Sequence, residues 1–202
     1  MRTRLLRTFF SFALLAALPA VFSAQGLSNL TDVQASGGIK EALARGVSAA
    51  IAATGRAGGF EGNPLIKIVF PEKLRLVEKA LRASGLGGQV DKFEHSMNSA
   101  AEQAAPAARD IFLKALREMT IEDAIGIVRG GPTAGTEYFR RKTSDEIKIA
   151  FRPIVHKTMM SNGVTEKYEA LMSKAPFGVA EKFDLDNYVL NKATDGLFYM
   201  MG

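Results

Sequence analysis

Apolar residues recur every three or four positions along most of the chain, which is the spacing of one face of an α-helix. The stripes run from Ser36 to Gly55, Pro71 to Gly85, Val90 to Ala104, Pro106 to Met119, Thr120 to Gly130, about Thr133 to Asn162, Val164 to Met172 and Asp184 to Leu197. The connections between them are short, which favours helices packed in antiparallel or orthogonal pairs. We therefore predict one compact all-α domain of about seven helices over residues 36–202.

Local signals mark several helix ends. Ser36 and Asp184 are predicted N-caps, because their side-chain oxygens can accept a hydrogen bond from the first helical turn. Thr120 and Asp123 form a pair typical of a capping box. Pro153 is expected to kink the longest helix, since it lacks a backbone donor and crowds the preceding turn.

Residues 55–64 interrupt the helical pattern, because these ten residues contain four glycines and a proline. This stretch lacks the Lys-Ser/Thr end of a phosphate-binding P-loop, so it is predicted to be a connector. Residues 65–70 are the one convincing β-like run. A single short strand cannot form a sheet, so we expect an extended segment that lies on helices, or a small hairpin.

The N-terminus has the features of a secretory signal. Residues 1–24 contain three arginines, a short apolar stretch ended by Pro19, and small residues near Ala24. We predict cleavage within residues 20–25, a flexible leader over residues 25–35, and a periplasmic or secreted bacterial protein. A short uncleaved membrane anchor is the alternative. The chain contains no cysteine, so it is not expected to be a lipoprotein.

Net charge, cysteine content and the length of apolar segments exclude several classes of function. Arg2, Arg4 and Arg7 supply three of the five net positive charges, so the chain after residue 24 carries a net charge of +2. Its basic and acidic residues are interleaved, which argues against a nucleic-acid partner. Without cysteine, disulfides, thiolate metal sites and thiol chemistry are excluded. No later segment is apolar enough to predict a transmembrane helix.

Several segments resemble the bacterial domain of unknown function 4197 family, in the same order and over nearly the whole of the predicted mature chain. They are residues 60–64 (FEGNP), 71–74 (PEKL), 96–102 (SMNSAAE), 119–124 (MTIEDA), 138–140 (YFR), 151–155 (FRPIV), 185–189 (LDNYV) and 195–198 (DGLF). The resemblance implies an exported, helical protein. It implies no activity and no functional residues, because the family has none assigned.

The residues give little sign of catalysis or metal binding. His95 and His156 are the two histidines, they lie far apart, and neither belongs to a paired ligand motif. No nucleophile elbow is present. We therefore predict no metal, no cofactor and no catalytic residue, and we lean against an enzyme.

One set of polar residues stands beside the apolar stripes. Its members are Asn98, Glu102, Tyr138, Arg140 and Asp195. Asn98 and Glu102 share a helix face, because they are four residues apart. The set is interpreted either as the polar floor of a ligand pocket or as a structural network between helices. Arg140 is predicted to point inward and to pair with Glu102 or Asp195.

Three functions remain open. The first is a non-enzymatic protein that binds an apolar or amphipathic small molecule between helices, which the thirteen phenylalanines and eight methionines favour. The second is an envelope scaffold or protein-interaction module, with residues 197–201 of the last helix as its surface. The third, which is the weakest, is an enzyme that uses carboxylates and arginine.

Overall fold

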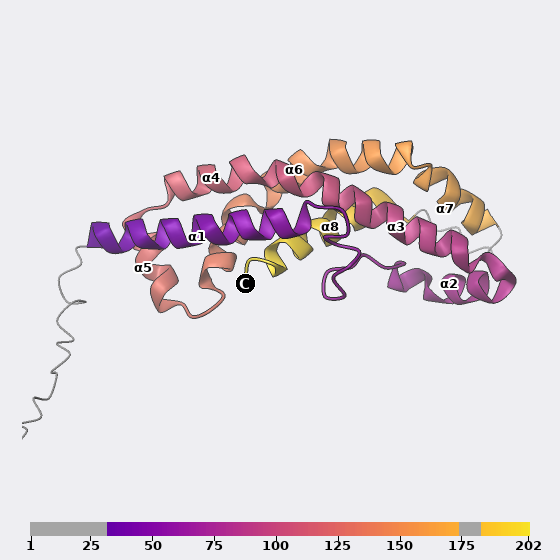
Figure 1. Ribbon diagram of the computed structural model, residues 1–202, viewed down its shortest axis with the longest axis horizontal. Helices are drawn as coiled ribbons and strands as arrows, with labels where there is room; N and C mark the ends of the chain where they lie inside the picture. Colours follow the sequence, from indigo (N-terminus) through magenta and orange to yellow (C-terminus); the bar gives the residue numbers. More distant parts are fainter. Residues whose placement is uncertain (1–31, 174–182) are drawn as a thin grey trace, which may run out of the picture. The chain divides into compact units, whose positions relative to one another are not determined.

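The described residues, 32–173 and 183–202 of a computed structural model, are almost entirely helical (Figure 1). Eighty-one percent of them lie in helices, and none of them forms a β-strand. The predicted all-α fold is therefore confirmed, and the hairpin alternative for residues 65–70 is not formed. The predicted signal segment, with residues 25–31 of the predicted leader, lies outside the described residues.

The helices follow the predicted order and are close to the predicted number. They are α1 (Asp32–Thr54), α2 (Arg75–Leu81), α3 (Gly87–Ala104), α4 (Ala108–Glu118), α5 (Ile121–Arg129), α6 (Ala134–Ser161), α7 (Val164–Ser173) and α8 (Leu185–Tyr199). Short helical turns join some of them: a 3₁₀ turn at Glu72–Leu74, a π turn at Arg82–Leu86 and a 3₁₀ turn at Ala105–Ala107.

The helix ends test the local signals of the sequence. The capping box is present, because the Asp123 N–H donates to Thr120 Oγ1 at 3.0 Å and the Thr120 N–H donates to Asp123 Oδ2 at 3.1 Å. Asp184 caps α8 as predicted, since it accepts from the Asn187 N–H. Ser36 is not a cap. It is buried within α1, which starts one turn earlier because neither proline nor glycine separates it from Asp32.

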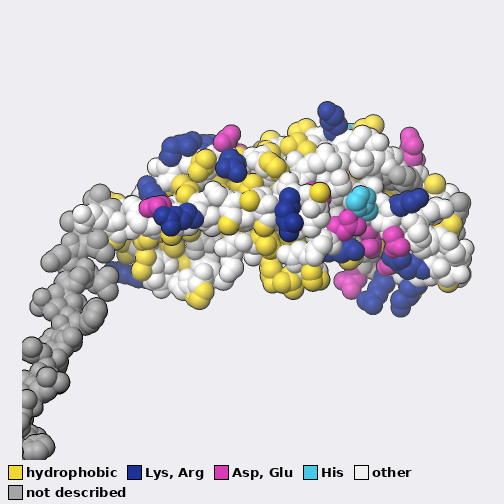
Figure 2. All heavy atoms as spheres, viewed as in Figure 1, with side chains coloured by type: hydrophobic (Ala, Val, Ile, Leu, Met, Phe, Trp, Pro, Cys, Tyr) yellow, Lys and Arg dark blue, Asp and Glu magenta, His cyan; other side chains and the backbone are white. Residues whose placement is uncertain are grey.

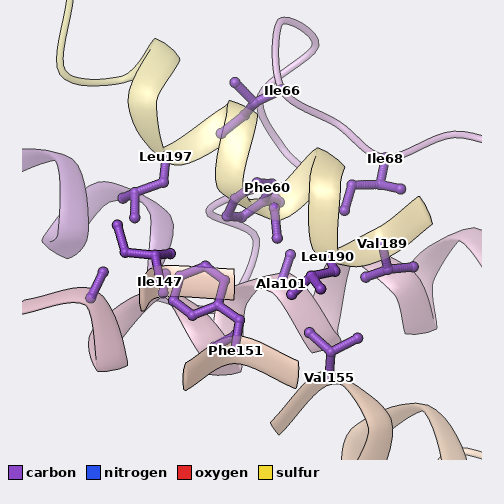
Figure 3. Packing of buried hydrophobic residues seen from close by; sticks show 14 of the residues in the cluster. Phe60, Ile66, Ile68, Ala101, Ile147, Phe151, Val155, Val189, Leu190 and Leu197 are labelled. Atoms are coloured by element: carbon purple, nitrogen blue, oxygen red, sulfur yellow. The ribbon is translucent and has the colours of Figure 1, made fainter. Parts of the chain in front are cut away.

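Helices α3, α6 and α8 pack against one another around the centre of the core, while α4 packs against both α1 and α6. Figure 3 shows side chains from α3, α6 and α8 converging on Phe60, which belongs to none of these helices. Phe60 is fully buried, as are Phe151 on α6 and Leu197 on α8. The core therefore includes a piece of the connector that follows α1.

In the last six residues of the connector, which runs from residue 55 to residue 70, buried and exposed side chains alternate much as they do in a β-strand. Ile66, Ile68 and Phe70 are buried, whereas Leu65 and Val69 are exposed. This is the predicted extended segment lying on helices. The buried side chains face the core beside α8, as Figure 3 shows for Ile66 and Ile68.

Two glycines make room for this connector. A Cβ on Gly196 of α8 would stand 2.6 Å from Cε1 of Phe60, so a larger residue would push the ring out of its position. A Cβ on Gly59 would stand 2.5 Å from the backbone oxygens of Ala53 and Thr54. The connector thus turns back against the end of α1 and packs under α8 only because both positions lack a side chain.

Within the described part of the chain, no helix combines the length and the apolar character that crossing a membrane requires.

Candidate functional site

Three polar side chains of α3 hold the connector to the helix. Glu94, Asn98 and Glu102 are spaced four residues apart, so they stand one above another on a single face. Each accepts a hydrogen bond from a backbone N–H of residues 60–70. We call these three residues the α3 polar ladder. A connector without β-sheet partners has its buried backbone groups satisfied by side chains instead.

Asn98 is the central member of the ladder and is fully buried. Its Oδ1 accepts from the Ile68 N–H at 2.8 Å, and its Nδ2 donates to the Ile68 carbonyl oxygen at 2.8 Å. The same amide group also donates to the carbonyl oxygen of Glu94 at 2.8 Å. The side-chain amide therefore pairs with both backbone groups of one residue, as a neighbouring β-strand would.

The outer members are carboxylates that are almost fully buried. Glu94 accepts from the Phe70 N–H at 2.8 Å, and Glu102 accepts from the N–H groups of Phe60 and Glu61 at 3.0 and 3.2 Å. Hydrogen bonds to a charged acceptor are stronger than those to a neutral one. Sequence reasoning selected Asn98 and Glu102 but missed Glu94, although its spacing of four residues from Asn98 was a usable signal.

Other contacts hold the connector from outside the ladder. Nδ1 of His95 lies 2.6 Å from Oε2 of Glu61, and the Tyr188 hydroxyl donates to the Val69 carbonyl oxygen at 3.0 Å. Nδ2 of Asn63 donates to the sulfur of Met200 at 3.2 Å. His95 therefore has a structural partner across the connector, and both ends of α8 contact residues 63–69.

Tyr138 belongs to a different place in the fold. Its hydroxyl donates to the Ala115 carbonyl oxygen at 3.0 Å, which ties α6 to α4. Burial raises the pKa of Tyr138 above its usual value, and the negative charges of Asp123 and Glu118 raise it further. The hydroxyl is therefore held neutral, with its proton committed to a backbone acceptor.

Arg140 on α6 pairs with Asp195 on α8. Asp195 was one of its two predicted partners, and the other, Glu102, binds the connector instead. Nη1 of Arg140 lies 2.8 Å from Oδ1 of Asp195, and its guanidinium carbon lies 4.7 Å from the centre of the Phe198 ring. The side chains are 39% and 62% exposed, so the inward position predicted for Arg140 is wrong. Its aliphatic part covers the core while its charge remains in solvent.

The five polar residues selected from the sequence therefore occupy three separate places. Asn98 and Glu102 hold the connector on α3, Tyr138 joins α6 to α4, and Arg140 pairs with Asp195 at the surface. Each member makes a contact within the protein that accounts for its polar group.

A surface groove lies where the end of the connector meets α8. It has a volume of about 350 Å³ and is lined by Val69, Phe70, Glu72, Arg75, Glu78, Tyr188 and Lys192. We call it the Tyr188 groove. Val69, Phe70 and Tyr188 provide apolar surface, and the other four lining residues are charged. Burial raises the pKa of Tyr188, with contributions from the charges of Glu94 and Glu72.

The charged residues of the Tyr188 groove differ in how they are paired. Glu78 accepts from Nε of Arg82 at 2.8 Å, and Glu72 lies 3.6 Å from Arg75. The Lys192 ammonium lies 5.8 Å from the centre of the Tyr188 ring, and none of the described carboxylates forms an ion pair with it. Lys192 is therefore a positive charge beside apolar surface.

A second groove, of about 400 Å³, lies between α5 and α6. Glu122, Asp123, Glu137 and Arg141 are among its lining residues, and Ile127 is its largest aliphatic side chain. It offers less apolar surface than the Tyr188 groove. Across residues 32–173 and 183–202, no three His, Asp or Glu side chains gather in a way that could hold a metal ion.

Residues 29–202 match the family described as "Protein of unknown function (DUF4197)". The match spans most of the sequence, so the chain belongs to this family, and the resemblance drawn from its segments is confirmed. No curated protein and no solved structure matches the chain.

Proposed function

We propose that this protein is a non-enzymatic binding protein for a small amphipathic molecule, and that the Tyr188 groove is its binding site. The observation that carries the proposal is an apolar wall formed by Val69, Phe70 and Tyr188 beside the unpaired ammonium of Lys192. An apolar chain would cover Val69 and the Tyr188 ring, and an acidic head group would pair with Lys192. The volume is within the range of small-molecule sites.

Hydrogen bonds hold the walls of the Tyr188 groove in place. The Tyr188 hydroxyl donates to the Val69 carbonyl oxygen, so the two walls are joined at their base. Phe70, next to Val69, is held on α3 by Glu94. A site whose walls are already held in place loses little conformational entropy when a ligand binds.

The test is a thermal-shift assay with dodecanoate and dodecylamine, which share a chain but differ in the charge of the head group. Dodecanoate is expected to raise the Tm, because a ligand that binds only the folded state stabilises it. Lys192→Gln should remove most of that rise. Val69→Glu should abolish it, because it places a negative charge in the groove.

Leu76→Glu is the matched control. Leu76 is an exposed apolar residue near Val69 in sequence, but it does not line the groove. Its variant should keep the response to dodecanoate. Equal Tm shifts for the wild-type protein and the Val69→Glu variant, or a larger shift with dodecylamine, would reject the groove as an acid-binding amphiphile site.

A scaffold or interaction role is the second candidate, and the end of α8 favours it. Tyr199 is 54% exposed, and the connector near it carries Leu65, which is 69% exposed. Asn63 and Met200 join these two regions. Leu197 and Phe198, which the sequence assigned to the same surface, are buried in the core.

Native mass spectrometry of the protein from its own cells separates the two roles, since a retained small mass supports ligand binding and a second polypeptide supports a scaffold.

Export remains a proposal that rests on residues 1–24. Their charged start, short apolar stretch and small residues favour cleavage within residues 20–25 and a periplasmic or secreted protein. The intact mass of the protein recovered from the envelope fraction tests it. A species that still begins at Met1 would contradict cleavage.

A further inference from the structure

The second half of α6 carries basic residues but no acidic ones. Acidic residues are absent from Ile147 to Thr165, whereas Lys148, Arg152 and Lys157 lie within that stretch. None of these three forms an ion pair with another described residue. Unpaired basic residues also occur elsewhere in the described part of the chain, as at Lys73 and Lys79, so the distinguishing feature of this stretch is that it contains no acidic residue.

The same half of α6 exposes large apolar side chains. Ile149 is 72% exposed and Met160 is 60% exposed, and Pro153 between them is also exposed. The spacing of 3.6 residues per turn places Ile149, Pro153 and Met160 on one stripe. Arg152 and Lys157 border this stripe on opposite sides, and Lys148 lies farther round the helix, half-buried at the edge of the core. We call these six residues the α6 outer face.

In Figure 2, dark blue and yellow side chains lie next to one another at the upper edge, over the part of α6 that Figure 1 draws in orange. His156 lies on the same side of the helix, and its Nδ1 is 2.6 Å from Oδ2 of Asp186 on α8. Asp186 is therefore paired with a residue of α6, and Glu146, one turn before Ile149, is paired with Lys114. Asp145 also lies one turn before Ile149 and marks the end of the acid-free stretch.

We infer that the α6 outer face docks on the surface of an anionic lipid bilayer. An apolar stripe bordered by lysine and arginine suits an interface where acyl chains lie beneath acidic head groups. The apolar side chains would enter the boundary between head groups and chains, while the three cations remain at the phosphates. An acidic protein would attract the cations but would not need the exposed apolar stripe. This inference is independent of the Tyr188 groove.

The test is flotation with two kinds of vesicle, pure phosphatidylcholine and phosphatidylcholine mixed with phosphatidylglycerol. The protein is purified after export, so that any processing of its N-terminus has taken place. Binding to the mixed vesicles is expected, with much weaker binding to phosphatidylcholine alone. Replacing Lys148, Arg152 and Lys157 together by glutamine should lower the partition coefficient about a hundredfold, at about fivefold for each cation.

A matched control removes the same charge elsewhere. Lys73, Lys79 and Arg129 are exposed basic residues of the η1 turn, α2 and α5, and none of them lies on α6. The variant with glutamine at these three positions should bind mixed vesicles within about twofold of wild type. The small loss that is expected comes from the lower net charge of the whole protein, which acts only weakly beyond a Debye length. Lys192→Gln should also bind normally, which distinguishes docking by α6 from capture of a lipid in the Tyr188 groove.

The apolar stripe is tested by Ile149→Gln, which should weaken binding to mixed vesicles roughly tenfold. Circular dichroism confirms that each variant keeps its helical fold. Three results would overturn the inference: no binding of the wild-type protein to mixed vesicles, equal losses in the two triple variants, or full binding by Ile149→Gln. The last would mean a purely electrostatic contact, as with an acidic protein.

Discussion

Asn98 on α3 and Arg140 on α6 are both polar residues that adjoin an apolar stripe, yet the structure gives them opposite surroundings. Asn98 is fully buried and pairs with both backbone groups of Ile68. Arg140 is 39% exposed, and its partner Asp195 is 62% exposed. A buried polar group is costly when it loses its partner, whereas an exposed pair exchanges its contact for water. The free energy of unfolding should therefore depend strongly on the α3 polar ladder and weakly on the surface pair.

The largest effect is expected for Asn98→Ala. It leaves the N–H and carbonyl of Ile68 without a partner in the core, which should lower the free energy of unfolding by about 3–4 kcal/mol. Urea melts measure the loss. Gln89→Ala, at an exposed position on the same helix, is the control and should cost less than about 1 kcal/mol. Similar losses at both positions would mean that the ladder does not hold the connector.

Gly196→Ala tests the opposite side of the connector, where Phe60 packs under α8. The added methyl group would stand 2.6 Å from the ring, so overpacking should cost about 2 kcal/mol. Gly126→Ala in α5 is the matched control, because its added Cβ would have no contact within 4 Å beyond the adjoining residues and the backbone of its own helix. That variant should gain about 0.5–1 kcal/mol from helix propensity. A stable Gly196→Ala protein would show that Phe60 can move.

Tyr138→Phe is an intermediate case, since it removes one buried hydrogen bond to Ala115 and leaves the ring in place. At neutral pH the loss should be about 1 kcal/mol. The raised pKa of Tyr138 means that the unfolded chain releases the proton first as the pH rises. Stability should therefore fall above about pH 10, and the variant should show a smaller fall. Urea melts between about pH 8 and about pH 11 check the sign, and a steeper fall in the variant would contradict it.

The smallest effect is expected for Arg140→Ala, at about 1 kcal/mol or less, because the lost contacts with Asp195 and Phe198 are at the surface. The loss should shrink as salt is added, since exposed charges are screened. Arg141→Ala, at the neighbouring exposed position, should cost still less. A loss near 3 kcal/mol at Arg140 would erase the contrast with Asn98 and imply that the pair is buried in solution.

The α3 polar ladder and the Tyr188 groove differ in how much of each could be predicted from the sequence. Asn98 and Glu102 were correctly placed on one helix face, because the spacing of four residues depends only on helix geometry. Their partners were not predictable, since these are backbone groups 30 to 42 residues away in the connector. The Tyr188 groove was not predicted either, because it joins residues 69–78 to residues 188–192.

The sequence by itself determined the helices, because each apolar stripe and several of the caps act over a few residues. Thr120 with Asp123 and the cap at Asp184 needed no information from the rest of the fold. For residues 65–70 it predicted either an extended segment on helices or a small hairpin, and the structure decided for the first. Family membership followed from the order of short segments along the chain.

The tertiary structure alone decided which polar residues are buried and what they contact. Arg140 and Asn98 have similar positions beside a stripe, and only the packing of α8 and of the connector separates them. The same holds for Gly196, whose missing side chain matters because Phe60, 136 residues earlier, packs against it. Local spacing fixes the direction of a side chain on its helix, but burial is set by the element that covers that face, which lies far away in the chain.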